Sequence, residues 1–121
     1  MPSINEVLER VGRSRPDAVD DREKAQWLIE LDGQLYRTLT SADDPDKTPP
    51  AAFPEDGDKA LLVPAPWDRI YDLYVMAMVE FEMRDYEEYQ NTYALFNQAM
   101  TDFRAFWRRE HVPDAKYFKV W

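Results

Sequence analysis

The sequence predicts an all-α fold, a small bundle of about four helices, and three observations support this. Apolar residues recur at spacings of three and four along most of the chain, which is the period of an amphipathic helix. The most regular stretch runs without Gly or Pro through Tyr86, Tyr89, Tyr93, Phe96, Met100, Phe103 and Trp107. Only residues 60–63 look like an extended segment. We therefore expect a single helical domain spanning residues 1–121.

Composition limits the classes of function. The chain has 121 residues, of which 45% are hydrophobic and 32% charged, as in a folded domain with a charged surface. Its 24 acidic and 15 basic residues give a net charge of -9, which disfavours a nucleic-acid reader but suits a wall that DNA slides past. The absence of cysteine excludes disulfides, thiolate metal sites and cysteine nucleophiles.

No targeting or membrane segment is predicted. Residues 1–13 lack the continuous apolar core of a signal peptide. The longest apolar run, residues 73–79, is far shorter than a membrane span. We expect a protein that is made in the cytoplasm and has no membrane partner.

Two helices are predicted in the first third. Ser3 and Glu6 form a capping box, and the segment from Gly12 to Pro16 ends the first helix. A second helix should begin near Asp20 or Asp21, where an acidic side chain suits the helix dipole. Its expected inward face consists of Ala25, Leu28, Leu31, Leu35 and Leu39.

Residues 41–66 form a long irregular loop that is rich in Asp and Pro. Within it, Leu61, Leu62 and Val63 read as a short extended segment that ends at Pro64. These three residues either support the core or form an exposed edge that pairs with a neighbouring subunit. We treat them as candidate partner-binding residues.

The third helix should start at Pro66 and Trp67. Residues 70–81 leave almost no polar face, so this helix should be surrounded on all sides, and in a four-helix domain that predicts contact with other chains. A tight turn near Arg84 and Asp85 then gives a long antiparallel hairpin. The fourth helix would measure roughly 40 Å, more than the domain needs, so part of it should also face another chain.

The chain closes with an arm, residues 112–121, after Pro113. It carries four large apolar residues, Tyr117, Phe118, Val120 and Trp121. Exposed apolar residues of this size are an aggregation hazard. The arm should therefore fold back on the core or dock on a partner.

Catalytic motifs are weak. His111 is the one histidine, it lies near a helix end that favours its charge, and a nucleophilic triad has no basis. The pairs Glu6-x-x-Glu9 and Glu82-x-x-Asp85 resemble fragments of the acidic motif of all-α nucleotide pyrophosphohydrolases, which hold magnesium, but most of the chain separates them. Gly-rich phosphate loops are missing. We expect no enzyme, no cofactor and no catalytic or metal site.

The segment LLVPAPWDRIYDLYVMAMVEFEMRDYEEYQNTYALFNQAMTDF, residues 61–103, resembles small proteins encoded among the virion structural genes of tailed phages. In those proteins a Leu-Val-Pro-x-Pro stretch leads into an aromatic helix, and a Tyr-Asn or Phe-Asn pair follows in the next helix. The matching positions are Leu62, Val63, Pro64, Pro66, Tyr71, Tyr74, Tyr89, Phe96 and Asn97. The N-terminal third has no matching segment.

Such proteins are similar to head-to-tail adaptors, helical proteins that form a ring beneath the portal after DNA packaging. The resemblance implies a non-enzymatic protein of the virion neck and a ring of self-copies, twelvefold in the expected case. Its partners would be the portal protein and a stopper or tail-completion protein, and DNA would pass through without specific binding. The resemblance also implies that the terminal arm grips the portal. Two alternatives stay open: a magnesium-dependent nucleotide pyrophosphohydrolase, and a small dimeric regulatory or chaperone-like binding protein.

Overall fold

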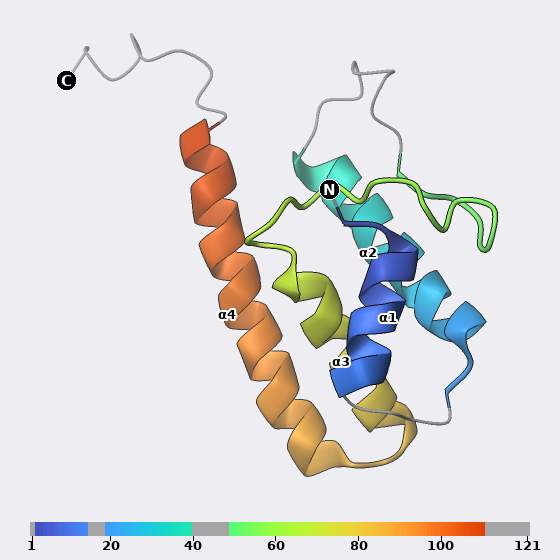
Figure 1. The fold of residues 1–121 in the computed structure, drawn as a ribbon. Coiled ribbons are helices and arrows are strands. Elements are labelled where there is room, and N and C mark those ends of the chain that lie inside the picture. Colours follow the sequence, from blue (N-terminus) through green and yellow to red (C-terminus); the bar gives the residue numbers. More distant parts are fainter. Residues whose placement is uncertain (1, 15–18, 40–48, 111–121) are drawn as a thin grey trace, which may run out of the picture.

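The computed structural model describes residues 2–14, 19–39 and 49–110, and the architecture is all-α. Figure 1 shows the four helices, which are α1 (Ile4–Ser14), α2 (Asp21–Leu39), α3 (Arg69–Glu82) and α4 (Tyr86–Glu110). The predicted fold class is confirmed, and α1, α2 and α4 begin close to the predicted positions. α3 begins at Arg69 because residues 65–68 form a turn before it.

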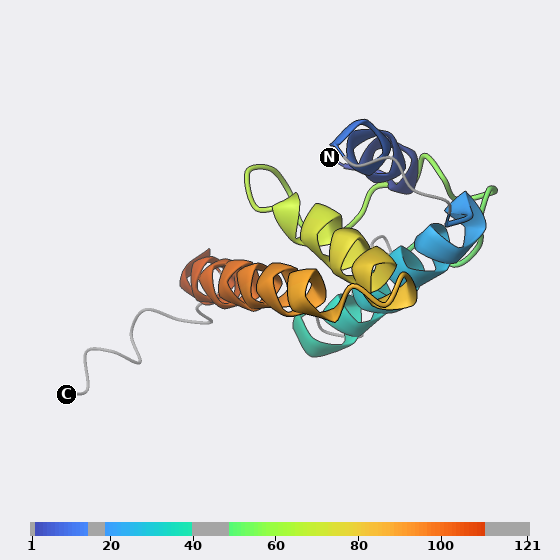
Figure 2. The ribbon, with the colours of Figure 1, turned by 90° about the horizontal axis from the view of Figure 1, so that it is seen from below.

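α3 is the central helix, and α1, α2 and α4 all pack against it. Figure 2, seen along the hairpin, shows α4 on one side of α3 and α1 and α2 on the others. Seven of its 14 residues are buried, among them Tyr71, Val75 and Ala77 at 0% exposure. Three helices of the same chain cover most of α3, whereas Phe81 near its C-terminal end is 45% exposed. The expected contact of α3 with other chains stays a prediction.

α3 and α4 form the predicted antiparallel hairpin, and its turn is Met83–Asp85 (Figure 1). Arg84 has a φ of 60°, in the left-handed region that non-glycine residues seldom adopt. Backbone bonds close the turn, from the Arg84 N–H to the Phe81 carbonyl at 3.0 Å and from the Asp85 N–H to the Glu80 carbonyl at 2.9 Å. These bonds satisfy carbonyls that the end of α3 would otherwise leave unpaired.

Polar bonds attach α1 to the start of α3. The Arg10 guanidinium donates to Asp68 Oδ2 at 2.9 Å and to Asp72 Oδ1 at 2.8 Å. At the N-terminus of α1, the Glu6 N–H donates to Ser3 Oγ at 3.3 Å, which is half of the predicted capping box. Because the apolar face of α1 is also buried, this short helix is held by docking.

The apolar stripe of α4 changes its environment along the helix. Phe96, Met100 and Phe103 are buried in the core, whereas Tyr86 at the start of the helix is 51% exposed. The same periodicity thus forms the core at one end of α4 and surface at the other. No described helix is both long and apolar enough to cross a membrane.

Candidate functional site

Leu61, Leu62 and Val63 lie inside the core, at 1%, 6% and 0% exposure. Their backbone is also paired within the chain: the Leu61 N–H donates to the Pro2 carbonyl at 2.8 Å, and the neighbouring Ala60 bridges to Ser3. The segment supports the core, as one of the two alternatives describes. The assignment of these residues to partner binding is wrong, since neither their side chains nor their N–H groups are available.

Asp32 and Tyr71 hold this segment in place. We use the name Asp32 anchor for these two side chains together with the backbone N–H groups of Leu62 and Val63. The Tyr71 hydroxyl donates to Asp32 Oδ1 at 2.6 Å and accepts from the Val63 N–H at 2.8 Å. The Leu62 N–H donates to both Asp32 oxygens at 3.2 and 3.3 Å. Two N–H groups of a buried irregular segment therefore find acceptors on α2 and α3.

Burial governs the protonation of this anchor. It raises the pKa of the Asp32 carboxyl to about 6, against the lowering effect of the bonds from Tyr71 and Leu62. Burial, and then the charge of Asp32, also raises the pKa of the Tyr71 hydroxyl, so the hydroxyl keeps the proton that it donates. With 0% exposure on Asp32 and every contact made to the chain itself, the anchor has a structural role.

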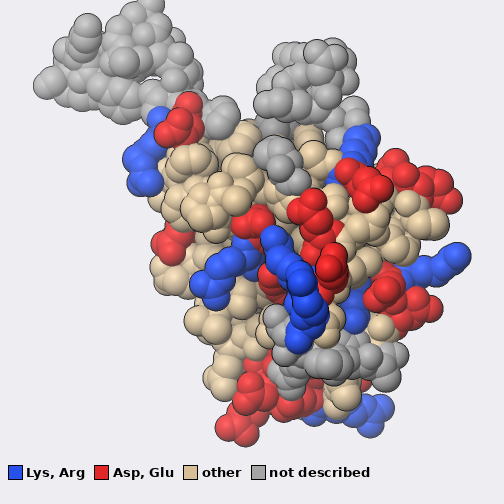
Figure 3. Space-filling view, viewed as in Figure 1, with Lys and Arg blue, Asp and Glu red and all other residues tan. Residues whose placement is uncertain are grey.

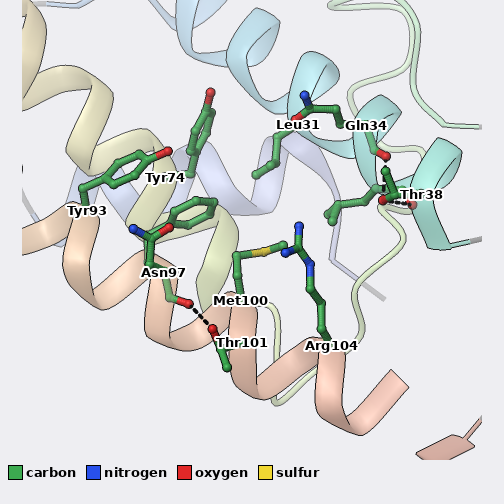
Figure 4. Close-up of a pocket in the computed structure, with 11 residues that line it drawn as sticks. Leu31, Gln34, Thr38, Tyr74, Tyr93, Asn97, Met100, Thr101 and Arg104 are labelled. Carbon is green, nitrogen blue, oxygen red and sulfur yellow. Dashed lines mark hydrogen bonds between the residues drawn. The ribbon is translucent and has the colours of Figure 1, made fainter. Parts of the chain in front are cut away.

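A groove between α2 and α4 is the best candidate for a functional site. Its cavity volume is about 640 Å³, and its walls come from both helices and from Tyr74 of α3. Figure 4 shows the lining residues facing one another across the opening. The full lining consists of Leu31, Gln34, Leu35, Thr38, Tyr74, Tyr93, Phe96, Asn97, Met100, Thr101 and Arg104.

The floor of the groove is apolar and its rim is polar. Leu31, Leu35, Phe96 and Met100 are buried below it, while Gln34, Thr38, Asn97, Thr101 and Arg104 are exposed along the edges. Arg104 supplies the single charged group among the lining residues. Such a lining has no paired acid and base for catalysis, but an apolar floor with polar edges matches an amphipathic peptide.

Hydrogen bonds within the helices occupy part of the rim. The Thr101 hydroxyl donates to the Asn97 carbonyl at 3.0 Å, and the Thr38 hydroxyl donates to the Gln34 carbonyl at 3.0 Å (Figure 4). Beyond Thr38, the Trp107 indole N–H donates to the Leu39 carbonyl at 3.1 Å. This bond joins the C-terminal ends of α2 and α4 and sets the width of the groove at that end.

An aromatic ladder connects the groove with the α3–α4 turn. Ring centroids lie 5.1 Å apart for Tyr74 and Phe96, 5.4 Å for Phe96 and Tyr93, and 5.5 Å for Tyr93 and Tyr89. The ladder continues from Tyr89 to Phe81 at 5.2 Å. These spacings are favourable for rings, so the first half of α4 is fixed by ring packing although much of it is exposed.

The acidic motif fragments do not form a site. α1, which carries Glu6 and Glu9, begins at the opposite end of the molecule from the turn that carries Asp85 (Figure 1). Among the residues that the structure describes, no group of three His, Cys, Asp or Glu side chains could hold a metal ion. The fragments therefore lack the convergence that magnesium binding by carboxylates requires.

The other predicted site residues, Tyr117, Phe118, Val120 and Trp121, lie outside the described residues, as does His111. Sequence reasoning missed the polar rim. Its signal was present, because Asn97, Thr101 and Arg104 follow one another at spacings of four and three and so share one side of a helix. Neutral polar residues beside an apolar stripe are common on any surface helix, so only the position of α2 identifies them as a rim.

Charge is unevenly distributed over the surface. In Figure 3 one group of acidic side chains lies at the lower end of the molecule, where Figure 1 places the α3–α4 turn, with basic side chains beside it and other acidic groups at the upper right. The residues concerned include Glu82, Glu87 and Glu88, all exposed. At the other end of α4, Arg108 and Arg109 occupy the last turn, where they complement the helix dipole.

Comparisons of the chain with models of known protein families, with curated proteins and with solved structures found no match.

Proposed function

We propose that this chain is a non-enzymatic structural adaptor of the head–tail interface of a tailed phage, where copies form a ring that joins the portal protein to a stopper or tail-completion protein. The observation that carries the proposal is the α2–α4 groove, with its apolar floor and neutral polar rim. The resemblance of residues 61–103 to phage structural proteins supports the choice of partner. Several of the matching positions have structural roles: Tyr74, Phe96 and Asn97 line the groove, and Leu62, Val63 and Tyr71 belong to the Asp32 anchor.

The groove fits a short amphipathic helix of the portal protein. Its α4 wall extends from Tyr93 to Arg104, a distance of roughly 16 Å at 1.5 Å per residue, which matches three turns of a bound helix. The apolar face of the bound helix would cover Leu31, Phe96 and Met100, and an acidic side chain near one end of that helix would pair with Arg104. Helix-in-groove recognition of this kind uses anchors at spacings of three and four.

The net charge of -9 supports the position of the ring around DNA. A negative wall repels phosphates, so the duplex passes without sticking. The twelvefold symmetry of the ring and its place in the virion neck are part of the same proposal and follow from the resemblance.

The test fills the groove without disturbing the core. Asn97 is exposed on the rim, so Asn97→Trp should place an indole in the groove while the buried residues stay in position. Asn91→Trp is the matched control, because Asn91 is an exposed asparagine of the same helix and does not line the groove. Binding of each full-length variant to purified portal rings is measured by biolayer interferometry, and the complexes are imaged by electron microscopy.

We expect Asn97→Trp to weaken portal binding at least about tenfold, or roughly 1.4 kcal/mol, while Asn91→Trp binds like wild type. Equal binding of both variants would remove the groove from the mechanism. If the wild-type chain binds neither portal rings nor the tail-completion protein, the proposed function is wrong.

A further inference from the structure

The α3–α4 turn exposes the largest apolar side chains at one end of the molecule. Phe81, Met83 and Tyr86 are 45%, 60% and 51% exposed, and the rings of Phe81 and Tyr86 contact each other at 5.6 Å. We call these three residues the hairpin tip. Scattered exposed apolar residues are ordinary, whereas three within six residues at one hairpin end, two of them in ring contact, are typical of an interaction surface.

Acidic groups accompany the hairpin tip. The turn and the adjoining helix ends carry Glu82, Asp85, Glu87 and Glu88, against Arg84 as a single cation. Figure 3 shows acidic side chains at the lower end of the molecule, with basic ones next to them. The chemistry that matches it is a segment with aromatic side chains and lysines, because each would find its complement.

The chain itself contains such a segment. Residues 116–121 read Lys-Tyr-Phe-Lys-Val-Trp, with two lysines and no acidic residue. Residues 103–109, Phe-Arg-Ala-Phe-Trp-Arg-Arg, also combine rings with positive charge, but they are part of α4. Residues 116–121 therefore match the hairpin tip in both apolar character and charge.

Geometry disfavours contact between Tyr117 and the tip of its own chain. α4 has 25 residues, so its ends lie about 36 Å apart. Tyr117 follows Glu110 by seven residues, which span at most about 25 Å when fully extended, and Phe118 gains only one residue more. An arm that stayed on its own chain would have to run almost fully extended along α4 to reach the tip, whereas the arm of another copy can reach it without this constraint.

We propose that residues 116–121 of one copy bind the hairpin tip of the next, with Tyr117 and Phe118 against Phe81 and Met83 and the lysines against Glu87 and Glu88. This contact joins two different surfaces, so it is a head-to-tail contact that generates a ring where the rotation closes. The inference rests on the proposed function, because it names the surfaces through which the proposed ring assembles. It assigns the arm to a neighbouring copy rather than to the portal.

Charge reversal tests the contact. One variant, Lys116→Glu with Lys119→Glu, makes the arm acidic, and a second, Glu87→Lys with Glu88→Lys, makes the tip basic. Either variant alone carries like charges on both surfaces and should self-associate at least about tenfold more weakly than wild type. A mixture of the two should recover association, because each arm then meets a tip of opposite charge. Sedimentation velocity at rising protein concentration measures all three samples.

The matched control is Asp21→Lys with Glu23→Lys. Both residues are exposed acids in the first turn of α2, so their reversal repeats the change in net charge and the unfavourable interaction with a helix N-terminus. This control should associate like wild type. Circular dichroism of every variant verifies that the helices are retained.

A second measurement does not depend on charge. The chain has no cysteine, so Met83→Cys on one copy and Phe118→Cys on another introduce one thiol each. Under mild oxidation, the mixture should form the mixed disulfide faster than a mixture of Phe118→Cys with Gln26→Cys, in which the partner thiol lies on exposed α2.

Unchanged self-association of both charge variants, a monomeric wild-type chain at millimolar concentration, or equal disulfide rates would overturn the contact. Portal binding distinguishes this failure from failure of the proposed function. A chain that binds portal rings through the groove but shows no tip contact keeps the function and loses the inference. If charge reversal in the arm abolishes portal binding and leaves self-association intact, the arm grips the portal and the inference is wrong.

Discussion

The Asp32 anchor and the hairpin tip invert the usual relation between polarity and burial. Asp32 carries a carboxyl group and is 0% exposed, whereas Met83 is apolar and 60% exposed. Both lie within or beside helices that pack on α3, so neither is at a loose end of the fold. The difference comes from what each residue satisfies.

The anchor shows that hydrogen-bond demand can place a carboxylate in a core. An irregular segment inside a protein carries N–H groups that need acceptors, and Asp32 and Tyr71 supply them to Leu62 and Val63. The hairpin tip shows the converse, because its apolar side chains stay exposed. The Phe81 ring contacts the rings of Tyr86 and Tyr89, yet Phe81, Met83 and Tyr86 are 45%, 60% and 51% exposed.

Removing one hydroxyl from the anchor should give the largest effect. Tyr71→Phe leaves the buried Val63 N–H without its acceptor and Asp32 without its 2.6 Å donor, so we expect a loss of about 2–4 kcal/mol in the free energy of unfolding. Urea denaturation followed by circular dichroism measures it. Tyr93→Phe deletes the same hydroxyl on a partly exposed groove residue and should cost less than about 0.5 kcal/mol. Equal losses would show that the anchor bonds contribute little.

The pH dependence of stability tests the burial of the same carboxyl. The pKa of Asp32 rises from its ordinary 3.8 to about 6 on folding, so between these values the folded chain binds a proton that the unfolded chain has released. The contribution of the protonated Asp32 carboxyl to stability is therefore full below about pH 4 and is lost as the pH rises through about 6. Two pKa units correspond to on the order of 3 kcal/mol.

The Asp32→Asn variant isolates this contribution. Its amide oxygen still accepts the Tyr71 hydroxyl but does not titrate, so the stability of the variant relative to wild type should rise by on the order of 3 kcal/mol from pH 4 to pH 7. Urea midpoints at a series of pH values give the difference. A difference that stays constant with pH would contradict the raised pKa, whatever its absolute size.

The hairpin tip should respond least in stability. Met83→Ser removes an exposed side chain whose burial is slight, so the free energy of unfolding should change by less than about 0.5 kcal/mol. Differential scanning calorimetry of wild type and variant checks this. A loss of more than about 1 kcal/mol would show that Met83 packs within its own chain, and the tip would cease to be a free surface.

Much of the fold was predictable because helix signals are local. The spacing of Phe96, Met100 and Phe103 identified the core face of α4, and the absence of Gly and Pro after Arg84 identified a tight turn. The candidate site was less predictable. Leu61, Leu62 and Val63 were assigned to a partner because nothing in their sequence shows that Asp32, 30 residues away, accepts the Leu62 N–H.

The sequence by itself determined the helices, their order and their apolar faces, since periodicity and capping depend on residues a few positions apart. Only the tertiary structure decided which of those faces are covered. It covered most of α3 with helices of its own chain, opened a groove between α2 and α4 and left the hairpin tip exposed. The physical reason is that burial depends on the distance and angle between helices, which are set by long-range contacts such as those of Arg10 with Asp68 and of Tyr71 with Asp32.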